Sequence, residues 1–346
     1  MWDQLLNWSA KEFGHLPWRH KRTLYRTLVS EIMLQQTTVA TVLQHFERFL
    51  VRFPDLKTLA SASEEELLVA WKGLGYYRRA KNLKKIAEKI AQDWKGEFPK
   101  GLDELQLIPG IGPYTANALV AIGMDQPALA VDANLERVLA RIYGIKTAKG
   151  PRLQKQLAQL FIEKKIVKER HHSFRALNEA LMDLGRTICQ ANRVSCEICP
   201  VKKNCQAFKL GSALSYPAGP IVDKKKAVEY NLSLLRVVVK KGSKVLAYQK
   251  SEGEWLAGQW ELPTFVISCD DKKMQQYLPL KTKLATKDLP IVKTGITKYS
   301  ITNHVLEINH TEWKEWSFAR ETSWRELGDA NSNLSTASEK CLAKIN

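Results

Sequence analysis

The chain has 346 residues, 45% of them hydrophobic, and its 53 Lys and Arg residues outnumber 36 Asp and Glu residues to give a formal net charge of +17. This length predicts two domains, and the charge favours a polyanionic partner, either nucleic acid or an anionic membrane, over a merely solubilising basic surface. With no run of about 18 apolar residues and no secretory signal, we expect a cytoplasmic protein without a membrane segment, whose six cysteines are ligands or free thiols rather than disulfides.

The first two-thirds of the chain has a helical pattern. From Leu24 to about Ile188, apolar residues recur at helical spacing. Ser63 followed by Glu66 has the spacing of a capping box, which marks the start of one of these helices. We therefore predict an all-α domain over residues 1–212.

The first candidate for chemistry is Glu31, in "RTLVSEIMLQQTTVA". It shares a helix face with Leu24 and Leu28, so its side chain should be at least partly buried. Burial disfavours the charged carboxylate and raises its pKa, which suits a general acid. The plainer interpretation is a buried glutamate satisfied by hydrogen bonds.

Two glycine-containing stretches follow. "GLGYYRRAKNL", residues 73–83, combines small residues, two tyrosines and three cations, which fits either a solvated basic helix start or a wedge that enters a base stack. In "LIPGIGPYTANAL", residues 107–119, we expect Gly110 and Gly112 to adopt a tight geometry closed to other residues. The helix that follows would present free N–H groups to a phosphate, unless the turn is an ordinary helix connection.

Further along, "LAVDANLERVLAR" places Asp132 at a predicted N-cap, with Asn134 in the first helical turn. Taken alone, Asp132 is better explained as a helix cap than as a catalytic group. Cysteines then occur with the spacing C-x6-C-x2-C-x5-C at positions 189, 196, 199 and 205. Four thiolates this close predict a metal site, and the spacing alone fits either tetrahedral zinc or a [4Fe-4S] cluster.

The pattern changes after a predicted linker at 213–228, within a stretch rich in small residues, proline and lysine. "YNLSLLRVVVKKGSKVLAYQK" predicts two strands around a Lys-Gly-Ser turn, and "KYSITNHVLEINHTEW" predicts a second strand pair. We therefore predict a separate α+β domain over residues 229–346.

Several motifs together resemble one protein family. "SEIMLQQT", "GLGYYRRAKNL", "LIPGIGPYTANAL", "VDANLERVLAR", "NEALMDLGRTIC" and the cysteines occur in the order found in MutY-type adenine DNA glycosylases of the endonuclease III superfamily, over most of residues 17–205. The resemblance implies a helix-hairpin-helix glycosylase domain with one [4Fe-4S] cluster per chain and a C-terminal Nudix-like domain. It implies base excision repair of adenine opposite 8-oxoguanine or guanine in double-stranded DNA, by a nucleoid-associated monomer.

By this resemblance, Glu31 protonates adenine N7, Asp132 stabilises the oxocarbenium-like sugar, and Asn134 supports the pair. Tyr114 stands where lyases of the superfamily carry a lysine, and no lysine occurs from position 101 to 145, so we expect base removal without strand cleavage. The resemblance assigns further residues by role: cluster ligands Cys189, Cys196, Cys199 and Cys205; DNA contacts Gln35, Gln36, Leu74, Tyr76, Arg78, Gly110 and Gly112; adenine pocket Arg19, Leu34 and Glu179.

The second domain departs from its family. "GEWLAGQWELPTF" resembles a Nudix-like opening, yet residues 264–304 contain no glutamate, so metal-dependent hydrolysis is not expected. The recognition loop, Phe-Ser-His in the family, reads Ile301-Thr302-Asn303 here or, shifted by one, Thr302-Asn303-His304. We expect this loop to read 8-oxoguanine with a strength that the sequence leaves open. Ala133 replaces a usual glycine, and we expect activity to survive.

Two alternatives remain at this stage. The same scaffold would serve a mismatch glycosylase that removes thymine or uracil. A non-catalytic DNA-binding iron–sulfur protein would use Glu31 and Asp132 only as structural residues, although such a protein would need neither the carboxylate pair nor a flipping wedge.

Overall fold

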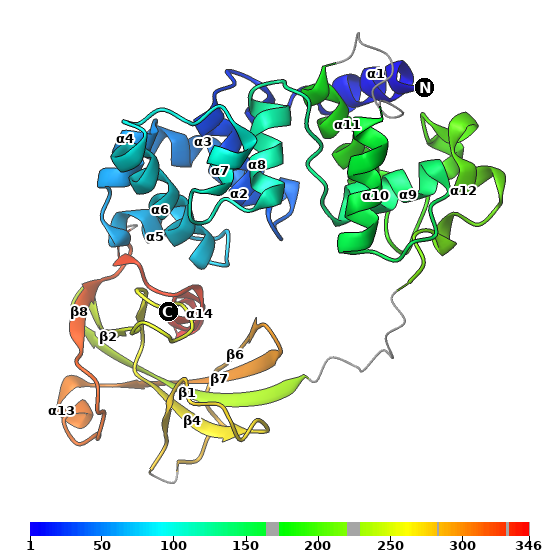
Figure 1. The fold of residues 1–346 in the computed structure, drawn as a ribbon. Coiled ribbons are helices and arrows are strands. Elements are labelled where there is room, and N and C mark those ends of the chain that lie inside the picture. The colour runs from blue at the N-terminus through cyan, green and yellow to red at the C-terminus, as the bar shows by residue number, and fades with distance from the viewer. Residues whose placement is uncertain (164–172, 220–228, 282–283, 330–331, 346) are drawn as a thin grey trace. The chain divides into compact units, whose positions relative to one another are not determined.

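Helices make up most of the N-terminal two-thirds of the chain and strands most of the remainder (Figure 1). The computed structural model describes residues 1–163, 173–219, 229–281, 284–329 and 332–345. By contacts the chain divides into a first unit, Met1–Ser61 with Arg78–Asp223, and a second unit, Ala62–Tyr77 with Lys224–Asn346. The helical and strand-rich character predicted for the two parts is confirmed. The predicted linker falls partly on residues 220–228, outside the described residues.

The first unit is built from helices joined by short loops. Their bounds are α1 Trp2–Phe13, α2 Leu24–Leu34, α3 Val39–Arg52, α4 Leu56–Ser61, α6 Arg78–Asp93, α7 Leu102–Gln106, α8 Pro113–Ala118, α9 Ala133–Tyr143, α10 Pro151–Ile162, α11 Phe174–Thr187 and α12 Gln206–Lys209. One core cluster is formed where α1, α9 and α11 bury their apolar stripes, with Leu5, Leu139 and Leu181 fully buried. This packing fixes the start of α9 beside α11, where the candidate site lies.

The second unit is a mixed sheet with few helices. Its elements are α5 Glu64–Trp71, β1 Tyr230–Lys241, β2 Lys244–Gln249, β3 Trp260–Glu261, β4 Thr264–Cys269, β5 Leu278–Pro279, β6 Ile291–Ile296, β7 Tyr299–Ile308, α13 His310–Trp313, β8 Ser323–Glu326 and α14 Thr336–Ile345. β1 pairs antiparallel with β2 and β4 and parallel with β7. The contacts also group residues 62–77 with this unit, which the sequence does not indicate.

Side chains alternate across the central strand β1 and so build two apolar layers. Val238 joins the core cluster that includes Cys341 and Leu342 of α14. Its neighbours Val237 and Val239 join the opposite cluster, which includes aromatic residues around α13. Because successive strand residues point to opposite faces, an apolar run such as "LLRVVV" indicates a strand buried on both sides.

Three local predictions concern a helix cap and two pairs of strands. The capping box of Ser63 and Glu66 is present at the start of α5, and the strands around the Lys-Gly-Ser turn are β1 and β2. The second predicted strand pair is wrong, because residues 299–308 form one strand, β7, whose hairpin partner is β6. Asn309 ends that strand by capping α13, its side chain accepting hydrogen bonds from the N–H groups of Thr311 and Glu312.

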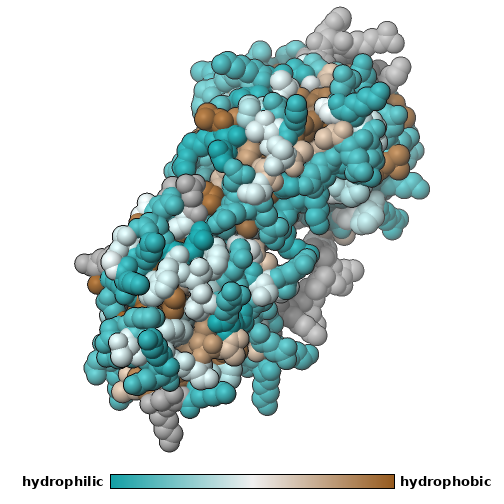
Figure 2. Space-filling view, turned by 90° about the vertical axis from the view of Figure 1, so that its left-hand side faces the viewer, coloured by the Kyte–Doolittle hydropathy of each residue, from teal (hydrophilic) through white to brown (hydrophobic). Residues whose placement is uncertain are grey.

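The surface agrees with a chain in which 26% of the residues are charged. The face in Figure 2 is mainly hydrophilic, with hydrophobic side chains scattered among polar ones. In the described part of the chain, no helix combines the length and apolarity that a bilayer crossing requires.

Candidate active site

A cleft in the first unit brings together residues from α2, α8, α9 and α11. We call it the carboxylate cleft, because Glu31, Asp132 and Glu179 all line it. Sequence positions far apart thus meet at one place. The predicted site residues that line the cleft are Arg19, Glu31, Leu34, Gln35, Gln36, Tyr114, Asp132, Asn134 and Glu179.

Glu31 is the most perturbed carboxyl group of the cleft. It projects from α2 and is only 7% exposed, so its predicted burial is confirmed. Burial, with smaller contributions from the charges of Glu179 and Asp132, raises the pKa of Glu31 from 4.5 to about 7, although a hydrogen bond from Tyr114 opposes the rise. At neutral pH a large fraction of Glu31 therefore carries a proton.

Tyr114 is the nearest polar partner of Glu31. Its hydroxyl donates to Glu31 Oε2 at 2.7 Å. Burial, followed by the charge of Glu31, raises the pKa of Tyr114 well above 10. The phenol therefore stays protonated and acts as a hydrogen-bond donor. It lacks the amine that imine formation needs.

Asp132 caps α9 and also faces the cleft. One carboxylate oxygen, Oδ1, accepts hydrogen bonds from the backbone N–H groups of Asn134 (2.9 Å) and Leu135 (2.8 Å), so the predicted N-cap is confirmed. The other oxygen, Oδ2, accepts from Asn134 Nδ2 at 2.7 Å. Donors on both oxygens fix the orientation of the carboxylate.

Arg137, which was not predicted from the sequence, orients the Asn134 side chain by a hydrogen bond. Its Nη2 donates to Asn134 Oδ1 and to the Gly185 carbonyl, both at 2.8 Å, and its Nε donates to the Cys189 carbonyl at 2.8 Å. Helix α11 approaches closely here, since a Cβ added to Gly185 would lie 2.8 Å from Asn134 Cβ. The spacing of three residues between Asn134 and Arg137 on one helix was the only signal in the sequence.

The far side of the cleft is organised by ion pairs. Arg22 makes a two-pronged contact with Glu179 (2.6 and 3.0 Å), and Arg19 Nη2 lies 2.8 Å from Asp183 Oδ2. Ser9 also donates to Asp183 at 2.6 Å. Arg22 and Asp183 were not predicted, because their partners lie far away in the sequence.

The glycine hairpin joins α7 to α8. Gly110 has φ of +99°, and a Cβ there would lie 2.2 Å from Asn82 Oδ1, so this position requires glycine. Gly112 has φ of −81° with open space around it, so the expectation that it also needs glycine is wrong. Gly112 is instead the N-cap residue of α8, with Pro113 at its first position, where a missing N–H costs little.

The remaining predicted DNA contacts lie outside this lining. Arg78, at the start of α6, is exposed. In the second unit, Leu74 is buried, whereas Tyr76 is 58% exposed with φ of +46°. A tyrosine held exposed in a left-handed conformation is an uncommon arrangement for a non-glycine residue.

The four clustered cysteines line one small cavity in the first unit. Arg141 spans two of them, because its Nη1 donates to Cys189 Sγ and its carbonyl accepts from Cys205 Sγ, both at 3.3 Å. Among the described residues, no three Cys, His, Asp or Glu side chains are arranged to hold a single metal ion. Four thiols around one small cavity form a donor set that fits an iron–sulfur cluster.

The predicted recognition residues of the second unit do not form one surface. Asn303 on β7 is fully buried and accepts from Arg236 Nε (2.8 Å) while donating to the Val292 carbonyl and to Thr294 Oγ1 (2.8 and 2.9 Å). Its neighbours Thr302 and His304 point to the opposite face and are half-buried. Asn303 therefore has its polar atoms engaged inside the protein.

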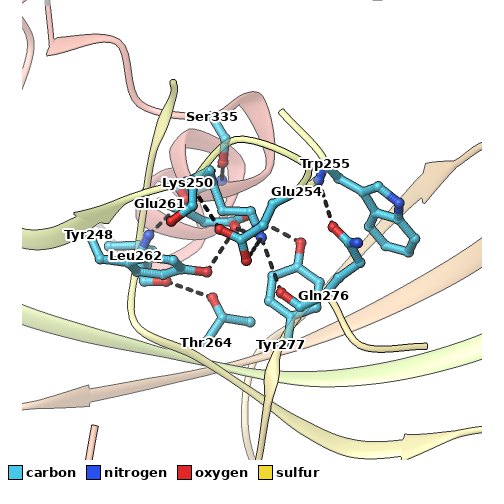
Figure 3. A network of polar contacts seen from close by, with 12 residues as sticks. Tyr248, Lys250, Glu254, Trp255, Glu261, Leu262, Thr264, Gln276, Tyr277 and Ser335 are labelled. Carbon is cyan, nitrogen blue, oxygen red and sulfur yellow. Dashed lines mark hydrogen bonds and ion pairs between the residues drawn. The ribbon is translucent and has the colours of Figure 1, made fainter. Parts of the chain in front are cut away.

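A buried polar network surrounds Glu261 in the same unit (Figure 3). Arg236 Nη1 lies 2.6 Å from Glu261 Oε1, Lys250 Nζ lies 3.7 Å from Oε2, and the Tyr248 hydroxyl donates to Oε2 at 3.2 Å. Burial alone would raise the pKa of Glu261, yet the charges of Arg236 and Lys250 hold it below its usual value. This network is internal and resembles a structural core rather than a ligand site.

Comparison with known proteins shows which superfamily the helical part of the chain is similar to. Residues 29–164 match the model of the HhH-GPD superfamily of base excision DNA repair proteins. A solved structure of a thermostable thymine-DNA glycosylase matches 60% of this chain and 94% of its own, with a TM-score of 0.52 and 27% identity. Over residues 29–164 the chain is therefore similar to the HhH-GPD superfamily.

Within that superfamily, the chain is similar to adenine DNA glycosylases, as the motifs predicted. It is 34% identical over 238 residues to the one from Buchnera aphidicola subsp. Schizaphis graminum (strain Sg), covering 68% of this chain and 66% of that protein. It is 29% identical over 365 residues to the protein from Rattus norvegicus, covering 92% of this chain and 70% of that protein. It is 38% identical over 212 residues to the protein from Homo sapiens, covering 59% of this chain and 38% of that protein. The chain thus spans just under two thirds of the Buchnera protein and a smaller part of the human one.

Proposed function

We propose that the protein is a monofunctional adenine DNA glycosylase that removes adenine mispaired with 8-oxoguanine or guanine. The observation that carries this proposal is the state of Glu31, a buried carboxyl group whose pKa is raised to about 7, in a cleft that also contains the fixed carboxylate of Asp132. A group that titrates near neutral pH can donate a proton at the pH of the cell.

The two carboxyl groups have complementary roles. Glu31, protonated, donates to N7 of an extrahelical adenine and makes it a better leaving group. The Asp132 carboxylate, held in one orientation by hydrogen bonds to its oxygens, stabilises the positive charge that develops on the sugar. Asn134, held by Arg137, keeps the Asp132 carboxylate in place.

The product is an intact strand with an abasic site. Tyr114 occupies the position from which a lysine would attack the sugar, and it donates a hydrogen bond to Glu31 instead. Without an amine at this position no imine forms between protein and sugar, so water completes the reaction.

The remaining residues bind the substrate and hold the fold. Double-stranded DNA is the partner, and the base must leave the duplex to reach the cleft. The duplex is contacted by Gln35, Gln36, Tyr76 and Arg78, whereas the predicted contact Leu74 is buried in this structure. Gly110 and Gly112 bring the hairpin to a phosphate, and the adenine is surrounded by Arg19, Leu34 and Glu179. The protein acts as a monomer in the cytoplasm, at the nucleoid, without a membrane.

One [4Fe-4S] cluster is bound by Cys189, Cys196, Cys199 and Cys205, whose side chains share one cavity. When bound, it supplies four iron–thiolate bonds that brace residues 189–205. Arg137 and Arg141 contact this segment through Cys189, and Arg137 also contacts Asn134. Visible absorbance of the purified protein tests this, because d¹⁰ zinc gives none.

The second unit, a Nudix-like domain, recognises the 8-oxoguanine opposite the adenine. Of the three residues predicted for this role, Thr302 and His304 have side chains that are not fully buried, and Asn303 braces β7 from inside through Arg236. Recognition therefore depends on the face of β7 that carries Thr302 and His304.

Duplexes with one defined mispair each test the proposal. Adenine opposite 8-oxoguanine or guanine should be released, with strand breaks only after alkali. Breaks without alkali would contradict the role of Tyr114. Release of thymine or uracil alone would favour a different mismatch glycosylase, such as the thymine-DNA glycosylase whose fold is similar. No release from any duplex would favour a DNA-binding protein without activity.

A further inference from the structure

Helix α2 ends beside the carboxylate cleft, and its end is held by one arginine from another helix. The last carbonyl groups of a helix lack partners within it, and the C-terminus carries partial negative charge. Arg79, the second residue of α6, donates through Nη1 to the carbonyls of Ile32 (2.9 Å) and Met33 (2.8 Å), and also to the carbonyl of Gln35. Its Nη2 donates to Thr37 Oγ1 at 2.9 Å.

The segment held in this way has an unfavourable backbone conformation. Gln36 has φ of +55°, in the left-handed region, which a side chain other than glycine occupies only at a cost. Such a conformation persists when the surrounding structure restrains it. The contacts of Arg79 fall on Gln35 and Thr37, on both sides of Gln36, so they supply that restraint.

We propose that Arg79 is a positioning residue that holds residues 35–37 in their cleft-lining conformation. Gln35, Gln36 and Thr37 line the carboxylate cleft directly, whereas Arg79 is absent from its lining and acts through them. The planar guanidinium can reach three carbonyls and a hydroxyl at once, which one ammonium group cannot do. Arg79 thus differs from its exposed neighbour Arg78, although the sequence presents them as two equivalent cations.

Hydrogen exchange on the full chain without DNA tests the structural step. We expect Arg79→Ala and Arg79→Lys each to speed amide exchange about tenfold in a peptide covering residues 33–39, while a peptide covering α9 is unchanged. Lys85→Ala is the matched control, because it removes an exposed cation from the same helix and should leave both peptides unchanged. The proposal would be overturned if either Arg79 variant exchanged at the wild-type rate in the peptide covering residues 33–39. It would also be overturned if exchange in the peptide covering α9 sped up by the same factor.

A second measurement connects this role to substrate, and it rests on the proposed function. In single-turnover adenine release, Arg79→Ala and Arg79→Lys should raise the enzyme concentration for half-maximal rate about tenfold and lower the maximal rate less than about threefold, because the Gln35–Thr37 segment contacts DNA. If Lys85→Ala had an equal effect, the loss would reflect only the removal of a positive charge from α6, and the proposal would be overturned. If the wild-type protein releases no adenine, the proposed function fails, and the exchange experiment still decides the role of Arg79.

Discussion

Two buried glutamates, one in each unit, have opposite chemistry. Glu31 is 7% exposed and Glu261 is 1% exposed, so both lose the solvation that favours a charged carboxylate. Glu31 has a neutral phenol as its hydrogen-bond partner and two carboxylates nearby, and its pKa rises to about 7. Glu261 has Arg236 and Lys250, and its pKa falls. Burial makes the pKa of each group sensitive to nearby charges, and the charge of the partners decides whether the carboxyl group holds a proton.

The largest effect should follow from removing the proton of Glu31. Glu31→Gln keeps the shape of the side chain but cannot donate an acidic proton, so base release should fall by roughly 10²- to 10⁴-fold. Affinity for a duplex with adenine opposite 8-oxoguanine should be retained. Single-turnover release and a binding titration measure the two quantities, and substantial residual turnover would show that the acid lies elsewhere.

The matching change at Glu261 should affect stability instead of chemistry. Glu261→Gln leaves Arg236 buried without a counter-charge, although Lys250 keeps Glu254 as a partner, and should lower the free energy of unfolding by about 3 to 5 kcal/mol. Urea unfolding measures this change. As control, Glu307→Gln removes a carboxylate from an exposed pair with Lys240 and should cost less than about 1 kcal/mol. Equal losses in both variants would contradict a special role for the buried network.

The two glutamates should also respond to pH with opposite sign. Because Glu31 has a raised pKa when folded, its contribution to stability is complete below pH 4.5 and is lost as pH rises through about 7, a loss of up to about 3 kcal/mol. Base release should decline over the same upper range, since the acid loses its proton. Glu261 has a lowered pKa, so its contribution exists above its ordinary value of 4.5 and is lost on acidification below it.

Thermal unfolding from about pH 2 to pH 8 measures these contributions in the wild type and in each glutamine variant. The stability of the wild type relative to Glu31→Gln should decrease as pH rises toward 8. A difference that does not vary with pH would mean that Glu31 titrates at its ordinary value.

The smallest effect concerns the support of Asp132. Gly185→Ala would place a methyl group 2.8 Å from Asn134 Cβ and 3.2 Å from Val138 Cγ2, so α9 and α11 must separate slightly, at a cost of about 1 to 3 kcal/mol. Base release should slow as Asn134 shifts from Asp132. Gly219→Ala is the control, because nothing lies within 4 Å of the added Cβ. Equal rates and stabilities for the two variants would contradict the close approach.

Much of the carboxylate cleft could be predicted because its signals are local. The helix face of Glu31 and the cap at Asp132 are read from residues within a few positions, and the structure has both. The partners could not be predicted in this way. Arg22 meets Glu179 across 157 positions, and no spacing rule connects residues that far apart.

The second unit shows the same limit for strands. Residues 298–313 have the composition of a strand pair, but the chain forms one strand and a short helix, because Asn309 caps that helix and β6 supplies the strand partner. Asn303 could be placed on a strand from sequence. Only the sheet and its packing decided that Asn303 faces Arg236 inside the protein while Thr302 and His304 face the other way.

By itself, the sequence determined the helical and strand-rich parts, the helix caps, the cysteine spacing and the absence of a lysine from positions 101–145. These features depend on neighbouring residues or on residue type alone. The tertiary structure decided which groups surround each buried charge. Glu31 meets Tyr114 across 83 positions and Glu261 meets Arg236 across 25. The pKa of a buried carboxyl group depends on these partners, so folding decides which glutamate can donate a proton.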